Sequence, residues 1–208
     1  MRLRITFAKT DAMRFTSHLD LHKTWERTLR RANLPLAYSQ GFNPHPRINL
    51  ASALPLGFTG EAEVVDVWLD QILPIPQIES DLERAAPPGI KIRKIQEIDD
   101  HAPTLQTELE ASEFVVTFLD ELDGLDAHLD ALLAAGSLPR QKRGKDYDLR
   151  PLVQELRRLP DDEHGCQRLL VRLSARPNAT GRPEEVIAAL GAQPEAARVH
   201  RLQLIFKE

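Results

Sequence analysis

The 208-residue sequence predicts an α+β protein of two successive β-α-β-β-α-β units, each an antiparallel sheet with both helices on one face. Three observations support this prediction. The length and the 42% content of hydrophobic residues suffice for one large domain or two small ones. Segments of apolar alternation, typical of strands, are interleaved with segments of helical periodicity. The order of these segments in the first half then recurs in the second.

Alternating apolar and polar residues over 2–9 predict the first strand. Ser17 and Asp20 stand at the spacing of a capping box, which predicts a helix that begins at Ser17. This helix is expected to end near Ala32, because Leu34-Pro35 follows it. The other elements of the first unit, residues 1–99, are strands at 48–53, 62–70 and 90–98 and a helix at 75–86. This is the order of a ferredoxin-like domain.

Residues 99–110 are polar and without pattern, which predicts a linker. We expect an inserted helix near 149–159 in the second unit, residues 111–208. The rest of that unit repeats the order, with strands at 114–119, 138–141, 167–175 and 198–206 and helices at 122–135 and 183–190. No residue-level repeat is visible, so the duplication rests on element order, and a single larger α+β domain is the alternative.

Composition excludes several classes of protein. Charged residues make up 28% of the chain, and no stretch approaches the roughly 20 apolar residues of a membrane span. The N-terminus also lacks the apolar core of a signal peptide. Cys166 is the single cysteine, so the chain cannot form an internal disulfide or a multi-thiolate metal site. We expect a cytoplasmic protein without membrane contact, metal or cofactor, since phosphate-loop and dinucleotide-binding motifs are also missing from the sequence.

Charge is segregated along the chain, although the net charge is only −4. Residues 1–50 contain nine Lys or Arg and three Asp or Glu; residues 51–136 contain four and eighteen, and residues 137–208 fourteen and ten. The two ends are therefore basic and the middle is acidic. Because salt screens charges beyond about 8 to 10 Å, a local basic face can bind phosphates despite the acidic middle.

The first helix carries its basic residues on one side. On a helical wheel Arg27, Arg30 and Arg31 lie opposite Leu21 and Trp25. We expect these three arginines to contact nucleic-acid phosphates, the alternative being an ordinary solvated face.

The sheet face turned away from the helices is a second candidate surface. A basic sheet with a flat aromatic side chain can hold RNA through phosphate contacts and base stacking. The alternative is that this face is packed and its tryptophan is core. The residues expected there are Arg2, Arg4, Arg47, Asn49, Trp68, Lys91 and Arg93.

The segment 38–47, YSQGFNPHPR, has the composition of a stiff binding loop. Gly41 permits a tight turn, and Pro44 and Pro46 restrict the backbone that follows. A rigid connector is the alternative. The residues of this loop that we expect to contact nucleic acid are Gln40, Asn43, His45 and Arg47.

A dense basic run lies in the second half of the chain. Arg140, Lys142 and Arg143 surround a glycine-containing turn, which suits a flexible loop that contacts phosphates. A solvated hairpin is an equally acceptable interpretation.

His18 and Tyr38 are candidates for general acid–base chemistry on RNA, which needs proton transfer and charge stabilisation but no metal. The alternative for His18 is a buried, hydrogen-bonded residue at the helix start. His18, His22 and His45 also suggest a metal site, but the sequence has no carboxylate in an HExxH frame, so we expect none.

The stretch from Phe15 to Leu69 resembles the family of radical-SAM-linked proteins, whose members occur alone or at the C-terminus of larger proteins with cobalamin-binding and radical-SAM modules. The resemblance implies a separately encoded radical-SAM partner and a connection to RNA, because family genes often adjoin those of ribosomal proteins and ribonucleases. This chain lacks a CxxxCxxC motif and cannot itself be the radical enzyme. The matching motifs are Ser17-His18-Leu19-Asp20, Arg27, Arg30-Arg31-Ala32, Leu34-Pro35, Tyr38 to Pro46, Pro55-Leu56-Gly57, Glu61-Ala62-Glu63 and, more loosely, Asp148-Leu149-Arg150.

These observations leave three hypotheses open. The first is an RNA-binding or substrate-presenting accessory module that acts with a radical-SAM partner in RNA or ribosome metabolism. The second is a metal-independent RNA-acting enzyme that uses His18; the predicted architecture is similar to that of CRISPR repeat-RNA endonucleases, which place a histidine near the first helix. The third is a protein-interaction domain that binds no nucleic acid.

Overall fold

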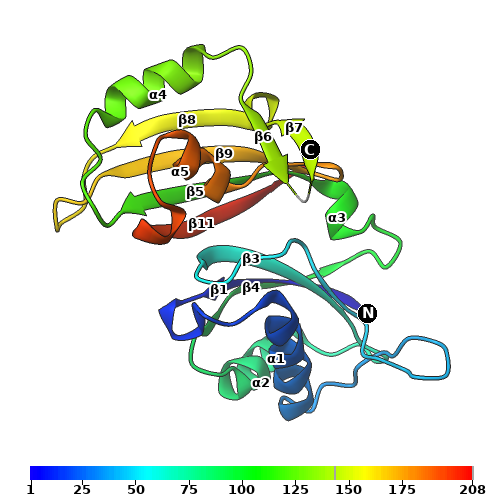
Figure 1. Ribbon diagram of the computed structural model, residues 1–208. Helices are drawn as coiled ribbons and strands as arrows, with labels where there is room; N and C mark the ends of the chain where they lie inside the picture. The colour runs from blue at the N-terminus through cyan, green and yellow to red at the C-terminus, as the bar shows by residue number, and fades with distance from the viewer. Residues whose placement is uncertain (143, 208) are drawn as a thin grey trace. The chain divides into compact units, whose positions relative to one another are not determined.

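The computed structural model describes residues 1–142 and 144–207, without the side chains of Lys142 and Lys145. The chain forms two compact units, Met1–Glu108 and Leu109–Glu208, each made of helices and an antiparallel sheet (Figure 1). Within the described residues, no helix is long and apolar enough to cross a membrane.

In the first unit, β1 lies between β3 and β4, and β2 pairs with the outer side of β3, so that the strand order is β4-β1-β3-β2. All three pairings are antiparallel, and Figure 1 shows α1 and α2 together on one face of this sheet. The β-α-β-β-α-β order predicted for this half is the order observed. The elements are β1 (Arg2–Lys9), α1 (His18–Arg31), β2 (Ile48–Leu50), β3 (Thr59–Trp68), α2 (Ile75–Ala85) and β4 (Ile90–Ile98).

The core of the first unit follows from two periodicities. Alternate residues of β1, such as Phe7, point toward the helices and are fully buried. The apolar side of α1 meets them, and the rings of Phe7 and Trp25 pack edge to face with centroids 4.8 Å apart. The Ser17 hydroxyl accepts a hydrogen bond from the Asp20 backbone N–H, which confirms the predicted N-cap.

Lys9, at the end of β1, is fully buried although it is charged. Alternation counted from Phe7 places it on the buried side of the strand. Its ammonium donates hydrogen bonds to the backbone carbonyls of Arg14, Thr16 and Phe58, at 3.3, 3.1 and 3.0 Å. These bonds compensate for the loss of hydration and tie the segment before α1 to the loop before β3.

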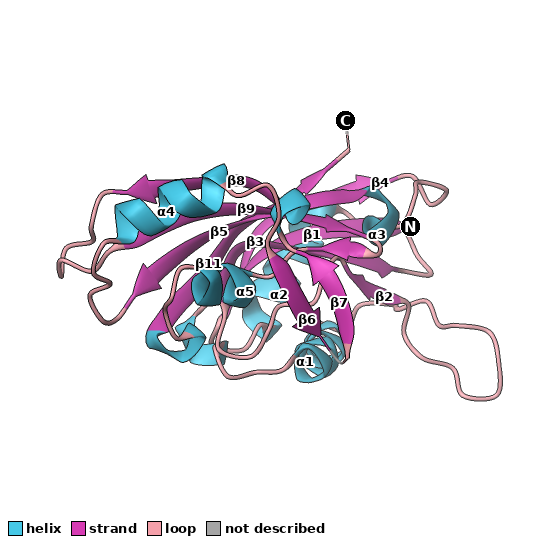
Figure 2. Ribbon diagram, turned by 45° about the horizontal axis from the view of Figure 1, so that its top comes forward, coloured by secondary structure: helices cyan, strands magenta, loops and turns pink. Residues whose placement is uncertain are grey.

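In the second unit, β5 lies between β9 and β11, and β8 pairs with the other side of β9, so that the strand order is β11-β5-β9-β8. Along the chain, the hairpin of β6 and β7, seen as a pair of strands in Figure 2, comes between α4 and β8. The short β10 (Ala179–Thr180) pairs with the end of β9. The other elements are β5 (Leu109–Phe118), α4 (Leu125–Ala134), β6 (Pro139–Lys142), β7 (Lys145–Asp148), β8 (Val153–Leu159), β9 (Arg168–Arg176), α5 (Pro183–Ala189) and β11 (Ala197–Phe206).

The predicted inserted helix at 149–159 is wrong: a short 3-10 turn, Arg150–Leu152, leads into β8. The pairing of β8 with β9 shifts between Val153 and Glu155, as at a β-bulge. The bulge puts Val153 and Leu156 on the same buried side although they are three residues apart. A spacing of three residues between apolar side chains is also typical of a helix, and this is why the sequence predicted one here.

The linker predicted at 99–110 is also partly wrong. It contains a short helix, α3 (Leu105–Glu108), and its last two residues already belong to β5. The polar composition of this segment concealed Leu105 and Leu109, both of which are buried.

The tripeptide Asp148-Leu149-Arg150 fastens the β6–β7 hairpin to α4. The Asp148 carboxylate accepts hydrogen bonds from the backbone N–H groups of Leu138 and Arg150, at 2.7 and 2.9 Å, and these bonds lower the pKa of Asp148. The Arg150 guanidinium donates to the carbonyls of Leu133 and Ala135, both at 3.2 Å, at the C-terminal end of α4. Leu149, which stands between Asp148 and Arg150 in the sequence, is fully buried.

We expect Asp148→Ala to destabilise the protein at neutral pH by an amount that shrinks in acid. A carboxylate whose pKa is lowered by folding contributes stability above the ordinary value of 3.8, and this stability is lost as the pH falls through the folded-state pKa. Urea unfolding followed by circular dichroism at neutral and acidic pH measures the difference from the unmodified protein. Asp130→Ala, which removes an exposed carboxylate from α4, is the control. A difference independent of pH would contradict the prediction.

Candidate nucleic-acid interface

The outer side of α1 carries three exposed arginines, as predicted. Arg30 pairs with Glu26 at 2.7 Å, whereas Arg27 and Arg31 have no ion pair within the described part of the chain. All three line a surface pocket of about 500 Å³, together with Thr24 and with Pro87, which precedes β4. The three arginines therefore border one depression instead of being scattered around the helix.

The segment 38–47 forms a hairpin loop. The Ser39 N–H donates to the His45 carbonyl at 2.8 Å, and the His45 N–H donates to the Ser39 hydroxyl at 3.0 Å. Gly41 has φ +138°, in the region that favours glycine. The candidate residues Gln40, Asn43 and His45 are all exposed, and Figure 1 shows the loop extending outward between α1 and β2.

The base of this loop is fixed to the end of β3. The Trp68 N–H donates to the Arg47 carbonyl at 3.1 Å, and the Ala37 N–H donates to the Trp68 carbonyl at 2.8 Å. The Arg47 guanidinium lies over the Trp68 ring, 4.6 Å from its centroid, and that of Arg2 lies over the same ring at 4.8 Å. The predicted contact residue Arg47 is therefore positioned by an aromatic ring.

Tyr38 joins the loop to α1. The Tyr38 hydroxyl lies within reach of the Arg30 guanidinium, and this interaction is the largest of the causes that raise the pKa of Arg30. Tyr38 is 42% exposed, so its ring remains open to solvent. This contact unites the arginines of α1 and the polar loop in one surface, which we call the α1–loop surface: Thr24, Arg27, Arg30, Arg31 and residues 38–47.

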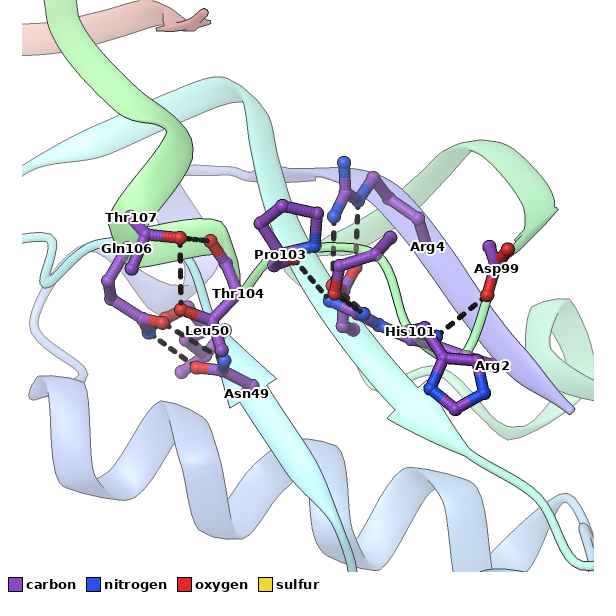
Figure 3. Close-up of polar contacts among 12 residues, drawn as sticks. Arg2, Arg4, Asn49, Leu50, Asp99, His101, Pro103, Thr104, Gln106 and Thr107 are labelled. Carbon is purple, nitrogen blue, oxygen red and sulfur yellow. Dashed lines mark hydrogen bonds and ion pairs between the residues drawn. The ribbon is translucent and has the colours of Figure 1, made fainter.

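The prediction of an open basic sheet face is wrong for Arg2 and Arg4. Both bind the carboxylate of Asp66, which is fully buried; the closest N–O distances are 2.7 Å from Arg2 and 2.9 Å from Arg4. Arg2 also donates to the carbonyls of Ala102 and Pro103 (Figure 3). Both guanidinium groups are thus held by one buried carboxylate, and Arg2 is itself buried, so this part of the sheet is not an open basic face.

Two other residues expected on that face also have partners. The amide of Asn49 donates to Gln106 at 3.0 Å, and Gln106 donates to the Leu50 carbonyl at 2.7 Å (Figure 3). Arg93 pairs with Glu61 at 2.5 Å. The segment 99–110, predicted as a linker, is therefore hydrogen-bonded to the first unit through Ala102, Pro103 and Gln106.

The structure does not bring the two candidate catalytic residues together. His18 is the first residue of α1, whereas Tyr38 contacts Arg30 near the other end of the helix. Twelve residues of α-helix separate the two positions by about 18 Å along the axis. Within residues 1–142 and 144–207, no group of three His, Cys, Asp or Glu side chains could hold a metal ion.

The second-half basic residues belong to the β6–β7 hairpin. Arg140 donates to the carbonyl of Pro139 at 2.8 Å and lies 3.9 Å from the Glu185 carboxylate. Arg143 and the side chain of Lys142 lie outside the described part of the structure.

Sequence reasoning missed Phe42, which is fully exposed at the tip of the loop. The signal was available, because a large apolar residue between Gly41 and Asn43 has neither the period of a strand nor that of a helix. It also missed Arg84 of α2, which lines a second pocket of about 440 Å³ together with Arg31.

Fold and surface together define an α+β protein of two units, the first of which carries a candidate polyanion-binding surface. Residues 2–183 match the family described as "Uncharacterized protein conserved in bacteria (DUF2344)", and the chain belongs to this family. No curated protein matches the chain.

Solved structures with a similar fold include a Cbf5-Nop10-Gar1 complex, with 11% identity and a TM-score of 0.52 over 97% of this chain and 48% of that one. An archaeal box H/ACA sRNP Nop10-Cbf5 complex has 13% identity and a TM-score of 0.48, over 99% of this chain and 49% of the other. An H/ACA RNP bound to a substrate RNA containing 2'-deoxyuridine has 10% identity and a TM-score of 0.44, over 88% of this chain and 43% of the other. The chain thus spans about half the length of these proteins, and at such identities the likeness concerns the fold alone.

We expect Asp66→Ala to lower the free energy of unfolding by about 3 to 5 kcal/mol, because it leaves the buried Arg2 guanidinium without its carboxylate. Urea unfolding monitored by tryptophan fluorescence measures this loss. Asp70→Ala, which removes an exposed carboxylate just after β3, is the matched control and should change stability by no more than about 0.5 kcal/mol. Equal stability of the two variants would show that the buried ion pair is not required.

Proposed function

We propose that the chain is an RNA-binding accessory module of the cytoplasm, which holds RNA on the α1–loop surface. The observation that carries this proposal is that three exposed arginines of α1 border one depression, next to an exposed loop of hydrogen-bonding side chains. Guanidinium groups bind phosphates through charge-assisted hydrogen bonds, and amide and imidazole groups can contact base edges.

The distribution of charge supports a local binding surface. The whole chain has a net charge of −4, so it does not attract polyanions over its entire surface. Arg2 and Arg4 are engaged by the buried Asp66, whereas Arg27 and Arg31 remain exposed without ion pairs among the described residues. In the first unit, α1 therefore offers exposed arginines to phosphate on the side of the helix that carries the loop.

We further propose that both units are ferredoxin-like and that the chain is a tandem of this fold. The strand orders β4-β1-β3-β2 and β11-β5-β9-β8 support this, because they coincide when β1 is matched with β5, β2 with β8, β3 with β9 and β4 with β11. The helices α1 and α4, and α2 and α5, then occupy equivalent positions in the chain. In this scheme the β6–β7 hairpin is an insertion that corresponds to the 38–47 loop.

We also propose a separately encoded radical-SAM protein as the partner for which the module presents RNA. The support is the resemblance of the motifs between Phe15 and Leu69 to radical-SAM-linked proteins. Affinity purification of the tagged chain from its native cells, with and without nuclease, tests this proposal. Recovery of a radical-SAM protein is expected, and its absence under both conditions would reject the partner. Recovery of an unrelated protein resistant to nuclease would favour a protein-interaction domain.

For RNA binding, we expect the double variant Arg27→Ala and Arg31→Ala to weaken binding and to reduce its salt dependence. If each arginine contacts one phosphate, the slope of log K against log salt should fall by about 2 on double-stranded RNA. Fluorescence anisotropy of a labelled RNA hairpin over a series of salt concentrations measures both quantities.

The matched control removes the same charge from the second unit, through Arg182→Ala and Arg198→Ala, both exposed. This variant should bind RNA as the unmodified chain does. If both double variants lose the same affinity, binding is a general charge effect. If the unmodified chain fails to bind RNA at low salt, the proposed function is wrong.

A further inference from the structure

Phe42 is fully exposed at the tip of the 38–47 loop, and nothing in the fold of the unit uses it. A single exposed apolar side chain is common on protein surfaces and needs no explanation by itself. This one differs in its setting, because it stands between Gly41 and Asn43 on a loop whose base is fixed on both sides.

The loop holds Phe42 at a defined place relative to the arginines. The Ser39–His45 hydrogen bonds close the hairpin, and Phe42 is the third residue beyond Ser39, so it extends at most about 10 Å from them. The neighbouring Tyr38 contacts Arg30 of α1. Ten ångströms is about the height of three stacked bases at 3.4 Å each. One short stretch of RNA can therefore extend from Phe42 at the tip of the loop to Tyr38 at its base.

We propose that Phe42 is a stacking platform for an unpaired base of the RNA whose phosphates lie on the arginines of α1. This inference rests on the proposed function and deepens it by naming the class of ligand. The ligand is RNA with accessible unpaired nucleotides, in a loop, a bulge or a single strand.

Physical chemistry favours this occupant over a continuous duplex. The faces of bases inside a helix are covered by their neighbours, whereas unpaired bases offer a free face to an aromatic ring. Gln40 and Asn43, both exposed beside Phe42, carry amide groups that can donate to and accept from the edge of the same base. The nearby guanidinium groups supply the positive charge that a nucleic-acid strand requires.

The test compares two labelled RNAs of equal nucleotide number by fluorescence anisotropy: a hairpin with an unpaired loop and a blunt duplex. We expect Phe42→Ala to weaken binding of the hairpin by about 5- to 150-fold, the range for loss of one base stack, and to leave duplex binding unchanged. Ile72→Ala, which removes another exposed apolar side chain from the first unit, should bind both RNAs as the unmodified chain does.

Phe42→Trp provides an independent reading of the contact. The natural tryptophans Trp25 and Trp68 are buried and half-buried, so the new indole is the exposed one. It should keep hairpin affinity, and its fluorescence should be quenched by the hairpin but not by the duplex.

The outcomes separate this inference from the proposed function. If Phe42→Ala binds the hairpin normally while the Arg27 and Arg31 double variant does not, the stacking role is wrong and RNA binding stands. If neither the unmodified chain nor any variant binds either RNA, the stacking inference and the proposed function are both wrong. If Phe42→Ala leaves RNA binding intact but abolishes nuclease-resistant recovery of a protein, Phe42 contacts a protein and the inference is overturned.

Discussion

A buried carboxylate organises the first unit. Asp66 of β3 is withdrawn from water and is stable there only because Arg2 and Arg4 of the neighbouring strand bind it. Arg2, so held, lies over the ring of Trp68, and the same ring carries Arg47 at the base of the exposed loop. One ion pair inside the sheet thus fixes, through an aromatic side chain, the loop that we propose as part of an RNA-binding surface.

The arginines of β1 and those of α1 therefore differ in their partners. Those of β1 satisfy internal acceptors, including two carbonyls of the segment that follows β4. Arg27 and Arg31 of α1 have no ion pair among the described residues, since the apolar side of this helix is the side that packs on the sheet. A helix whose outer side contributes nothing to the core is free to specialise in binding, and we propose this role for α1 through Arg27 and Arg31.

Local patterns predicted most of the fold because local physics decides it. The strand over 2–9 has the predicted bounds, and the cap at Ser17 is present, since alternation and hydrogen bonding act over a few residues. Prediction failed where a distant pairing intervenes: the bulge that gives β8 its helix-like spacing arises from its register with β9. The role of Asp66 was likewise hidden, because alternation tells which face a residue takes but not which charges meet there. Nor does sequence spacing reveal that His18 lies at the first turn of α1 whereas Tyr38 lies near its last turn.

The connection between the first helix and the second strand is long in both units, and in each it is a hairpin: residues 38–47 in one, β6–β7 in the other. The strand pairings that build the two four-stranded sheets are made by segments outside these connections. Their length and composition can therefore change over evolutionary time without disturbing the scaffold. Within a lineage, this is the place where a new ligand preference can arise while the core stays as it is.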